Sequence, residues 1–266
     1  MPGHPFRTQS AIVFVLAALL AIPLLGIHES RAGLPEALQR VKPSVVAVGT
    51  FQKTRSPPFV FRGTGFVVDD GTLVATAAHV MSEPLKSQDG EVLAILAPTA
   101  SKENPELRPA TVASVDKERD LAVLRIGGAP LPAVTLGNSD AVREGQSIAL
   151  TGFPIGQVLG FHAITHRGIV ASLTPVAIPA ANANQLTPRA IEQLRATPVT
   201  LFQLDATVYA GHSGSPVYDE DDGKVLGVIT MGFSRGAKDP IAGQVSRITF
   251  AVPSRFLRDL IVKARP

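Results

Sequence analysis

Short apolar runs of about four to eight residues, separated by glycine, proline and aspartate, recur along most of this chain and restrict its fold. The pair Gly65–Val68 and Thr72–Thr76 is joined by Asp69-Asp70-Gly71, which is a strong β-hairpin signal. With 23 glycines and 22 prolines, the sequence favours short strands and tight turns over long helices. The pattern therefore predicts an all-β barrel or sandwich. Further strands are expected at Val45–Val48, Val92–Leu96, Ala110–Val115, Leu121–Ile126, Ser147–Thr151, Gly168–Leu173, Phe202–Leu204, Ser215–Tyr218, Val225–Met231 and Ile248–Val252.

Two segments are predicted to be helical and two to be loops. Leu34–Lys42 has a proline in its first turn, and a second helix is expected at 254–264, with Ser254 as its N-cap. The polar stretch Ser101–Pro109 is expected to be a loop. Pro175–Pro198 is rich in alanine, asparagine and proline, and is expected to be a surface insertion.

The N-terminal segment has the pattern of an export signal. Arg7 precedes the charge-free apolar run Ala11–Ile27, and small residues follow at Ser30 and Ala32. Residues 1–32 are therefore predicted to be a signal peptide, with an uncleaved membrane anchor as the alternative. Either alternative places the remaining residues, 33–266, outside the cytoplasm, either secreted or periplasmic.

Composition excludes several classes of protein. The chain has no cysteine, which removes zinc ribbons, thiol redox pairs and cysteine nucleophiles. Its net charge of +3 gives little support to nucleic-acid binding. His162 and His166 lack the intervening glutamate of a zinc-protease helix, and Asp219–Gly223 lacks the ligand spacing of an EF-hand. We therefore expect no metal and no cofactor.

Three segments together carry the chemistry: His79 at the end of a strand, Asp120 before a strand, and Ser213 between glycines. A serine hydroxyl becomes a nucleophile when an imidazole takes its proton and a carboxylate orients that imidazole. Glycine beside the serine allows main-chain N–H groups to point at a developing oxyanion. Taken singly, each residue is more often structural. The order of the three residues and the segments that flank them indicate a catalytic role.

Chain order then separates two families. The segment around Ser213 partly matches the nucleophile elbow of α/β-hydrolases, but no histidine follows His212, as that fold requires. The order His79, Asp120, Ser213 instead resembles that of the chymotrypsin-like serine proteases, and more narrowly the protease domain of the HtrA/Deg group. The strings that carry this narrower resemblance are Gly63–Val67, Leu136–Asp140, Gly145-Gln146, Gly152-Phe153-Pro154, Gly168–Leu173, Leu204-Asp205-Ala206 and Phe250–Pro253.

This resemblance implies two six-stranded antiparallel β-barrels, at about 41–140 and 141–252, followed by the C-terminal helix. His79 would act as general base and then acid, Asp120 would orient it, and Ser213 would form the acyl-enzyme. The amides of Gly211 and Ser213 would form the oxyanion hole, with His212 contributing its peptide bond to the turn.

The resemblance also implies where the primary substrate pocket lies. Its walls would come from two stretches that contain no acidic residue, so a preference for lysine or arginine is not expected. Val208 and Met231 suggest a small or medium apolar side chain. The expected pocket residues are Thr207, Val208, Thr230, Met231 and Gly232.

The sequence departs from the HtrA group in four respects. That group usually has asparagine at the position of His212 and glycine at that of Ser215. The spacing from His79 to Asp120 is longer than usual, as is the Pro175–Pro198 segment. We expect no PDZ domain after the C-terminal helix, so gating by such a domain is not carried over.

Together these observations predict an exported serine endopeptidase that acts on unfolded or misfolded polypeptides, and the resemblance alone supplies the substrate. Two alternatives remain. The first is a catalytically silent binding module of the same fold, and the second is a glutamyl-specific or esterase-like hydrolase. The expected partner is a polypeptide substrate, without nucleic acid, and with a membrane only if the N-terminal segment stays uncleaved. Assembly into a homo-oligomer is left open.

Overall fold

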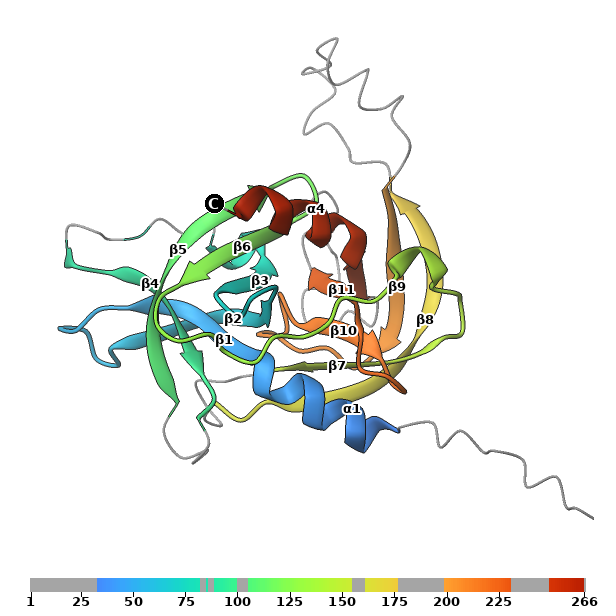
Figure 1. Cartoon of the computed structure of the whole chain (residues 1–266), viewed down its shortest axis with the longest axis horizontal. Helices are drawn as coiled ribbons and strands as arrows, with labels where there is room; N and C mark the ends of the chain where they lie inside the picture. The colour runs from blue at the N-terminus through green and yellow to red at the C-terminus, as the bar shows by residue number, and fades with distance from the viewer. Residues whose placement is uncertain are drawn as a thin grey trace, which may run out of the picture. The chain divides into compact units, whose positions relative to one another are not determined.

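Two closed antiparallel barrels of six strands each form the body of the protein, which confirms the predicted fold class (Figure 1). The computed structural model describes residues 33–81, 85, 89–99, 105–154, 161–176, 199–230 and 249–265. The predicted signal segment, 1–32, lies outside these residues. No helix in the described ranges is long and apolar enough to cross a bilayer.

Barrel one is closed by strands in the order β1-β2-β3-β6-β5-β4. Its interior is apolar because Val, Ile and Leu side chains from neighbouring strands meet there, with Ile95 and Leu124 fully buried, while Phe66 and Leu121 face the other way and pack in a second core cluster with residues of α1, α4 and barrel two. Its strands are β1 (Val45–Phe51), β2 (Phe59–Val68), β3 (Leu73–Ala77), β4 (Val92–Ala97), β5 (Glu106–Asp116) and β6 (Leu121–Ile126).

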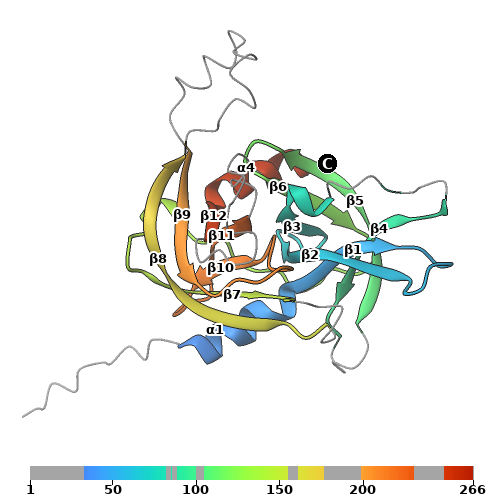
Figure 2. The ribbon, with the colours of Figure 1, turned by 180° about the vertical axis from the view of Figure 1, so that it is seen from behind.

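Barrel two is closed in the order β10-β11-β12-β9-β8-β7. Its two longest strands, β8 and β9, run side by side with antiparallel pairing, as the view from behind shows (Figure 2). Its strands are β7 (Ser147–Gly152), β8 (Ile164–Val176), β9 (Val199–Ala206), β10 (Pro216–Asp219), β11 (Val225–Thr230) and β12 (Thr249–Pro253).

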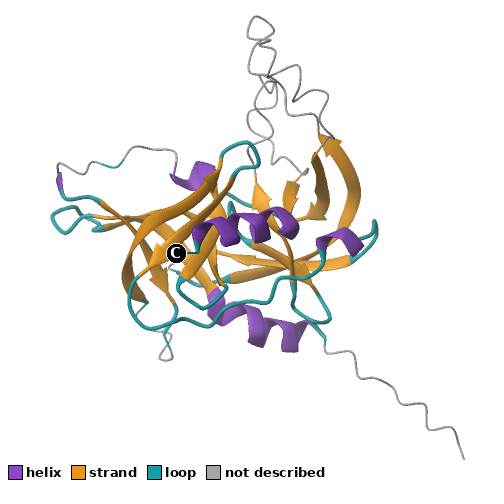
Figure 3. Ribbon diagram, turned by 45° about the horizontal axis from the view of Figure 1, so that its top comes forward, coloured by secondary structure: helices purple, strands orange, loops and turns teal. Residues whose placement is uncertain are grey.

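Helices flank the barrels. The first, α1, spans Leu34–Val41, and α4 spans Ser254–Ala264 and contacts β5 and β6 of barrel one and β11 of barrel two (Figure 3). The predicted N-cap role of Ser254 is wrong. Pro253 occupies the cap position, and the Ser254 hydroxyl donates instead to the Gly137 carbonyl at 3.0 Å. This bond ties the start of α4 to the connection between the barrels.

The predicted loop at Ser101–Pro109 is wrong in part. Strand β5 begins at Glu106, which pairs with Ala97 of β4. The Arg108 guanidinium binds the Glu106 carboxylate at 2.9 Å and the Ala129 carbonyl at 2.5 Å. The charged side chains at the start of β5 therefore have hydrogen-bond partners. Of the predicted insertion, Pro175 and Val176 end β8, and 177–198 lie outside the described residues.

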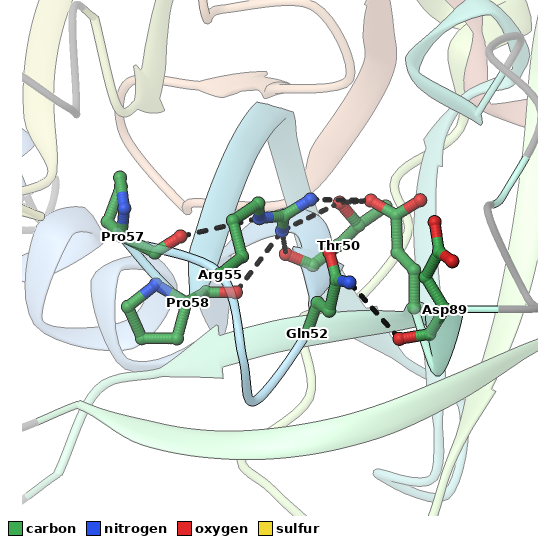
Figure 4. Close-up of polar contacts among 7 residues, drawn as sticks. Thr50, Gln52, Arg55, Pro57, Pro58 and Asp89 are labelled. Carbon is green, nitrogen blue, oxygen red and sulfur yellow. Dashed lines mark hydrogen bonds and ion pairs between the residues drawn. The ribbon is translucent and has the colours of Figure 1, made fainter.

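A partly buried ion pair stabilises the β1–β2 hairpin. The Arg55 guanidinium donates to the Glu91 carboxylate at 2.7 Å and to the Thr50 and Pro58 carbonyls at 2.8 and 3.2 Å (Figure 4). The Thr50 hydroxyl donates to the same carboxylate oxygen at 2.6 Å. Because Glu91 is 5% exposed, these donors compensate its loss of hydration.

Candidate active site

His79 and Asp120 reach the same end of barrel one because the strands that carry them are neighbours. Strand β3 pairs with β6 in antiparallel register, with Ala77 opposite Leu121. His79 follows β3 in a short 3-10 turn, Ala78–Met81, and Asp120 directly precedes β6. The Ala78 amide donates to the Asp120 carbonyl at 3.1 Å, which closes this corner of the sheet.

The two side chains form a close hydrogen-bonded pair. His79 Nδ1 lies 2.6 Å from Asp120 Oδ2, and the His79 amide donates to Oδ1 at 2.8 Å. The Thr230 hydroxyl, on β11 of barrel two, also donates to Oδ2. Since a carboxylate accepts, the Nδ1 atom carries the proton, which leaves Nε2 of His79 as the acceptor. This is the tautomer that a general base requires.

Asp120 is kept charged in a mostly buried place. Burial by itself would raise the pKa of Asp120, but the hydrogen bonds from His79 and Thr230 and the attraction of the imidazole outweigh burial and hold the pKa below its usual value. The Asp120 side chain is 12% exposed, whereas that of His79 is 29% exposed. Asp120 also has a left-handed backbone, with φ 56, a conformation that non-glycine residues rarely adopt outside functional sites or turns.

Ser213 lies in the turn between β9 and β10, beside the histidine corner. Gly63 of β2 lies between Ser213 and Val80, the residue after His79. A Cβ at Gly63 would lie 2.9 Å from the Ser213 carbonyl oxygen and 2.7 Å from Val80 Cγ2. Ser213 Oγ makes no hydrogen bond with His79 in the part of the chain that the structure describes. Such bonds are often long in proteases without substrate, and tighten when substrate binds.

The serine turn, residues 211–215, has three amides with carbonyl acceptors and two without an acceptor in the described ranges. The amides of His212, Gly214 and Ser215 donate to the carbonyls of Tyr209, Ile229 and His212 at 3.1, 2.9 and 2.8 Å. Those of Gly211 and Ser213 have no acceptor among the described residues. In a trans peptide the C=O and N–H point in opposite directions. The His212 carbonyl points into the turn toward Ser215, so the Ser213 N–H points out of it.

His212 is a fully buried residue of the serine turn. Its Nδ1 atom lies 3.3 Å from Ser215 Oγ, and its Nε2 atom has no partner in the described ranges. The ring packs edge-on against that of His166, with centroids 5.3 Å apart. Burial, together with the nearby His166, lowers the pKa of His212 to about 4, so the ring is neutral at physiological pH.

The predicted pocket residues do not all share one environment. Thr207 is exposed and Val208 is buried, while Met231 and Gly232 lie outside the described residues. Thr230 is 1% exposed and directs its hydroxyl at Asp120, so its side chain supports the His79–Asp120 pair. Neither this contact nor the role of Thr64 described below was predicted from the sequence. The His162 and His166 pair does not extend to a third ligand, since no three metal-binding side chains converge among the described residues.

Comparisons with known proteins agree with this geometry. The family described as the trypsin-like peptidase domain matches residues 63–228. The chain is 30% identical over 252 residues to the mitochondrial serine protease HTRA2 of Bos taurus, covering 93% of this chain and 46% of that protein. It is 28% identical over 203 residues to a probable periplasmic serine endoprotease, DegP-like, of Halomonas elongata, covering 76% of this chain and 35% of that protein. The chain thus spans less than half the length of these two relatives.

Two solved structures share the fold. An HtrA-type protease, AlgW with tripeptide, superposes with a TM-score of 0.60 at 23% identity, covering 86% of this chain and 62% of that one. Deg5 superposes with a TM-score of 0.60 at 24% identity, covering 85% and 90%.

Proposed function

The chain belongs to the family of trypsin-like peptidase domains, and we propose that it is a serine endopeptidase with His79, Asp120 and Ser213 as its catalytic triad. The observation that carries this proposal is the His79–Asp120 pair, which lies beside a serine turn with two free amides. A buried carboxylate that orients a partly exposed imidazole is the arrangement in which the imidazole activates a serine nucleophile on the other side of its ring.

The proposed reaction follows from these groups. Nε2 of His79 takes the proton of Ser213 Oγ as that oxygen attacks the substrate carbonyl carbon, and Asp120 stabilises the imidazolium that forms. The amides of Gly211 and Ser213 donate to the oxyanion of the tetrahedral intermediate, each contributing about 10²–10³-fold in kcat. His79 then returns the proton to the leaving amine, and a water molecule hydrolyses the acyl-enzyme by the same route.

The proposed setting and substrate rest on the N-terminal segment and on the relatives. The N-terminal apolar run supports export, with the chain either secreted or periplasmic. One relative is named a periplasmic endoprotease. By similarity to that group we propose unfolded or misfolded polypeptides as substrates, with a small or medium apolar residue before the cleaved bond.

An activity-based probe tests the triad. A fluorophosphonate should label the wild-type protein at pH 8, and Ser213→Ala should abolish the labelling. If the wild type is not labelled at any pH from 6 to 9, the chain is the silent binding module and the proposal fails.

A peptide-library cleavage profile tests the pocket. A dominant glutamate preference would contradict the apolar pocket, and cleavage of esters alone would indicate an esterase.

A further inference from the structure

Thr64 is a barrel-one residue whose polar atoms are directed at the serine turn of barrel two. It lies on β2, is fully buried, and is 147 residues away from Gly211 in the chain. Its hydroxyl donates to the Gly211 carbonyl at 2.7 Å, and its amide donates to the Ser213 carbonyl at 2.9 Å. One residue thus holds two of the carbonyl groups of the turn.

The hydroxyl of Thr64 is itself fixed. The Phe153 amide donates to Oγ1 at 3.1 Å, and the hydroxyl donates in turn to the Gly211 carbonyl. Gly152 permits this arrangement, since a Cβ there would lie 2.8 Å from Thr64 Oγ1. The hydrogen bonds of Thr64 therefore join β2, the end of β7 and the serine turn.

Gly211 is the residue of the turn that most needs such a restraint. Its φ is +99, a region open to glycine, and glycine rotates with little steric resistance. Rotation of its peptide groups would turn an oxyanion donor away from the reacting carbonyl group. Because peptide groups are planar, fixing the Gly211 carbonyl fixes the orientation of the Gly211–His212 peptide, which lies between the two free amides.

We propose that Thr64 is a positioning residue, whose hydroxyl holds the Gly211 carbonyl and thereby keeps the oxyanion donors of barrel two aligned from barrel one. The inference rests on the proposed peptidase function and names the support of the same site. Thr64 touches no reacting atom. Its effect is therefore expected in the transition state, where the oxyanion forms, and not in substrate binding.

Three variants test this role. Thr64→Val removes the hydroxyl and keeps the shape, Thr64→Ser keeps the hydroxyl, and Thr64→Ala removes it without a new methyl group. The matched control is Thr50→Val, which removes another fully buried threonine hydroxyl of barrel one, one that donates to Glu91 (Figure 4). For each, kcat and KM on a peptide substrate, the inhibition constant of a peptide aldehyde and the thermal midpoint are measured. Fluorophosphonate labelling of the wild type is measured first and decides the proposed function separately.

With a labelled wild type, Thr64→Val should lower kcat by about tenfold to a hundredfold with KM nearly unchanged, less than the loss of a donor itself. The aldehyde, whose adduct carries the oxyanion, should lose affinity in parallel. Thr64→Ser should stay within about threefold of the wild type, and Thr50→Val should keep its kcat while losing stability. The inference is overturned if Thr64→Val retains kcat, if kcat and the thermal midpoint fall alike in Thr64→Val and Thr50→Val, or if both Thr64→Val and Thr64→Ala fail to fold.

Discussion

Asp120 and His212 are both titratable and both buried, yet their surroundings differ. Asp120 accepts hydrogen bonds from the amide and ring of His79 and from Thr230, and its pKa is held below the usual range. His212 has one long contact with Ser215, and its Nε2 atom is left without a partner in the described part of the chain. The protein thus stabilises one buried charge by hydrogen bonds and keeps the other group neutral by burial.

From this difference we expect Asp120, and not His212, to take part in the proposed reaction. Asp120 is already held by three hydrogen-bond donors, so its carboxylate can stabilise a positive charge on the His79 imidazole without moving. The neutral ring of His212 contacts Ser215 and His166 and has no partner at Nε2 in the described ranges, so its contacts are those of a packed side chain. We therefore expect changes at Asp120 to affect turnover, and changes at His212 to affect stability, above all in acid.

The largest effect is expected from Asp120→Asn. The amide cannot fix the proton of His79 on Nδ1, so kcat should fall by about 10⁴-fold with little change in KM. Steady-state kinetics at pH 8 measures this loss. Asp69→Asn is the control, because Asp69 is another left-handed aspartate, paired with Arg265 at the surface. A loss of less than tenfold in Asp120→Asn would show that His79 is oriented without Asp120.

The next effect is the pH dependence of stability at His212. The pKa of this ring falls from 6.5 to about 4 on folding, so below pH 6.5 the unfolded state takes up the proton first. Its contribution to the free energy of unfolding is therefore complete above pH 6.5 and decreases as the pH falls to about 4, by roughly 3 kcal/mol. Asparagine has no such proton, so His212→Asn should lose less stability in acid.

Urea unfolding at pH 7 and pH 4.5 tests this difference between the wild type and His212→Asn. His162→Asn provides the control, because it makes the same substitution at an exposed histidine. If His212→Asn and the wild type lose the same free energy of unfolding on acidification, His212 is not held neutral by burial.

Gly152→Ala should disturb the region around His212 more moderately. A Cβ at Gly152 would lie 2.2 Å from Ser215 Oγ and 2.8 Å from both His212 Nδ1 and Thr64 Oγ1. Inserting a methyl group into a filled space costs about 1–3 kcal/mol. The urea midpoint measures the loss, and Gly127→Ala is the control, since no atom lies within 4 Å of a Cβ there. Equal midpoints for the two variants would show that the turn can move aside.

The sequence predicts the parts of this molecule that depend on local pattern. Leu121–Ile126 was predicted as a strand with its observed bounds, because it is an apolar run, broken at Arg125 alone, that lies in the core. Strand β2 was predicted only from Gly65, although it begins at Phe59. Its first half carries Arg62 and Gly63 and is only partly buried, so alternation fails there. Backbone pairing with β1, which sequence pattern does not reveal, holds that half in place.

In the candidate site, too, the sequence predicts the residues that stand in local motifs and misses those that act through distant contacts. The triad residues could be proposed because each stands in a short motif, whereas Thr64 and Thr230 act through side-chain contacts over 147 and 110 residues of sequence. Both lie within segments that were singled out for other reasons, Thr64 in a family string and Thr230 in the expected pocket. Which way a buried hydroxyl points depends on how the two barrels meet, and no local pattern encodes it.

The smallest effect is expected from Thr230→Val, which removes one of the donors to Asp120 and leaves the two from His79. The pKa of Asp120 should rise, and kcat should fall about fivefold, which corresponds to ~1 kcal/mol for one hydrogen bond. Thr230→Ser keeps the hydroxyl and should restore kcat. If Thr230→Ser is as slow as Thr230→Val, the methyl group matters and not the hydrogen bond. If Thr230→Val is as slow as Asp120→Asn, Asp120 depends on barrel two for its position, and the two bonds from His79 are not enough to hold it.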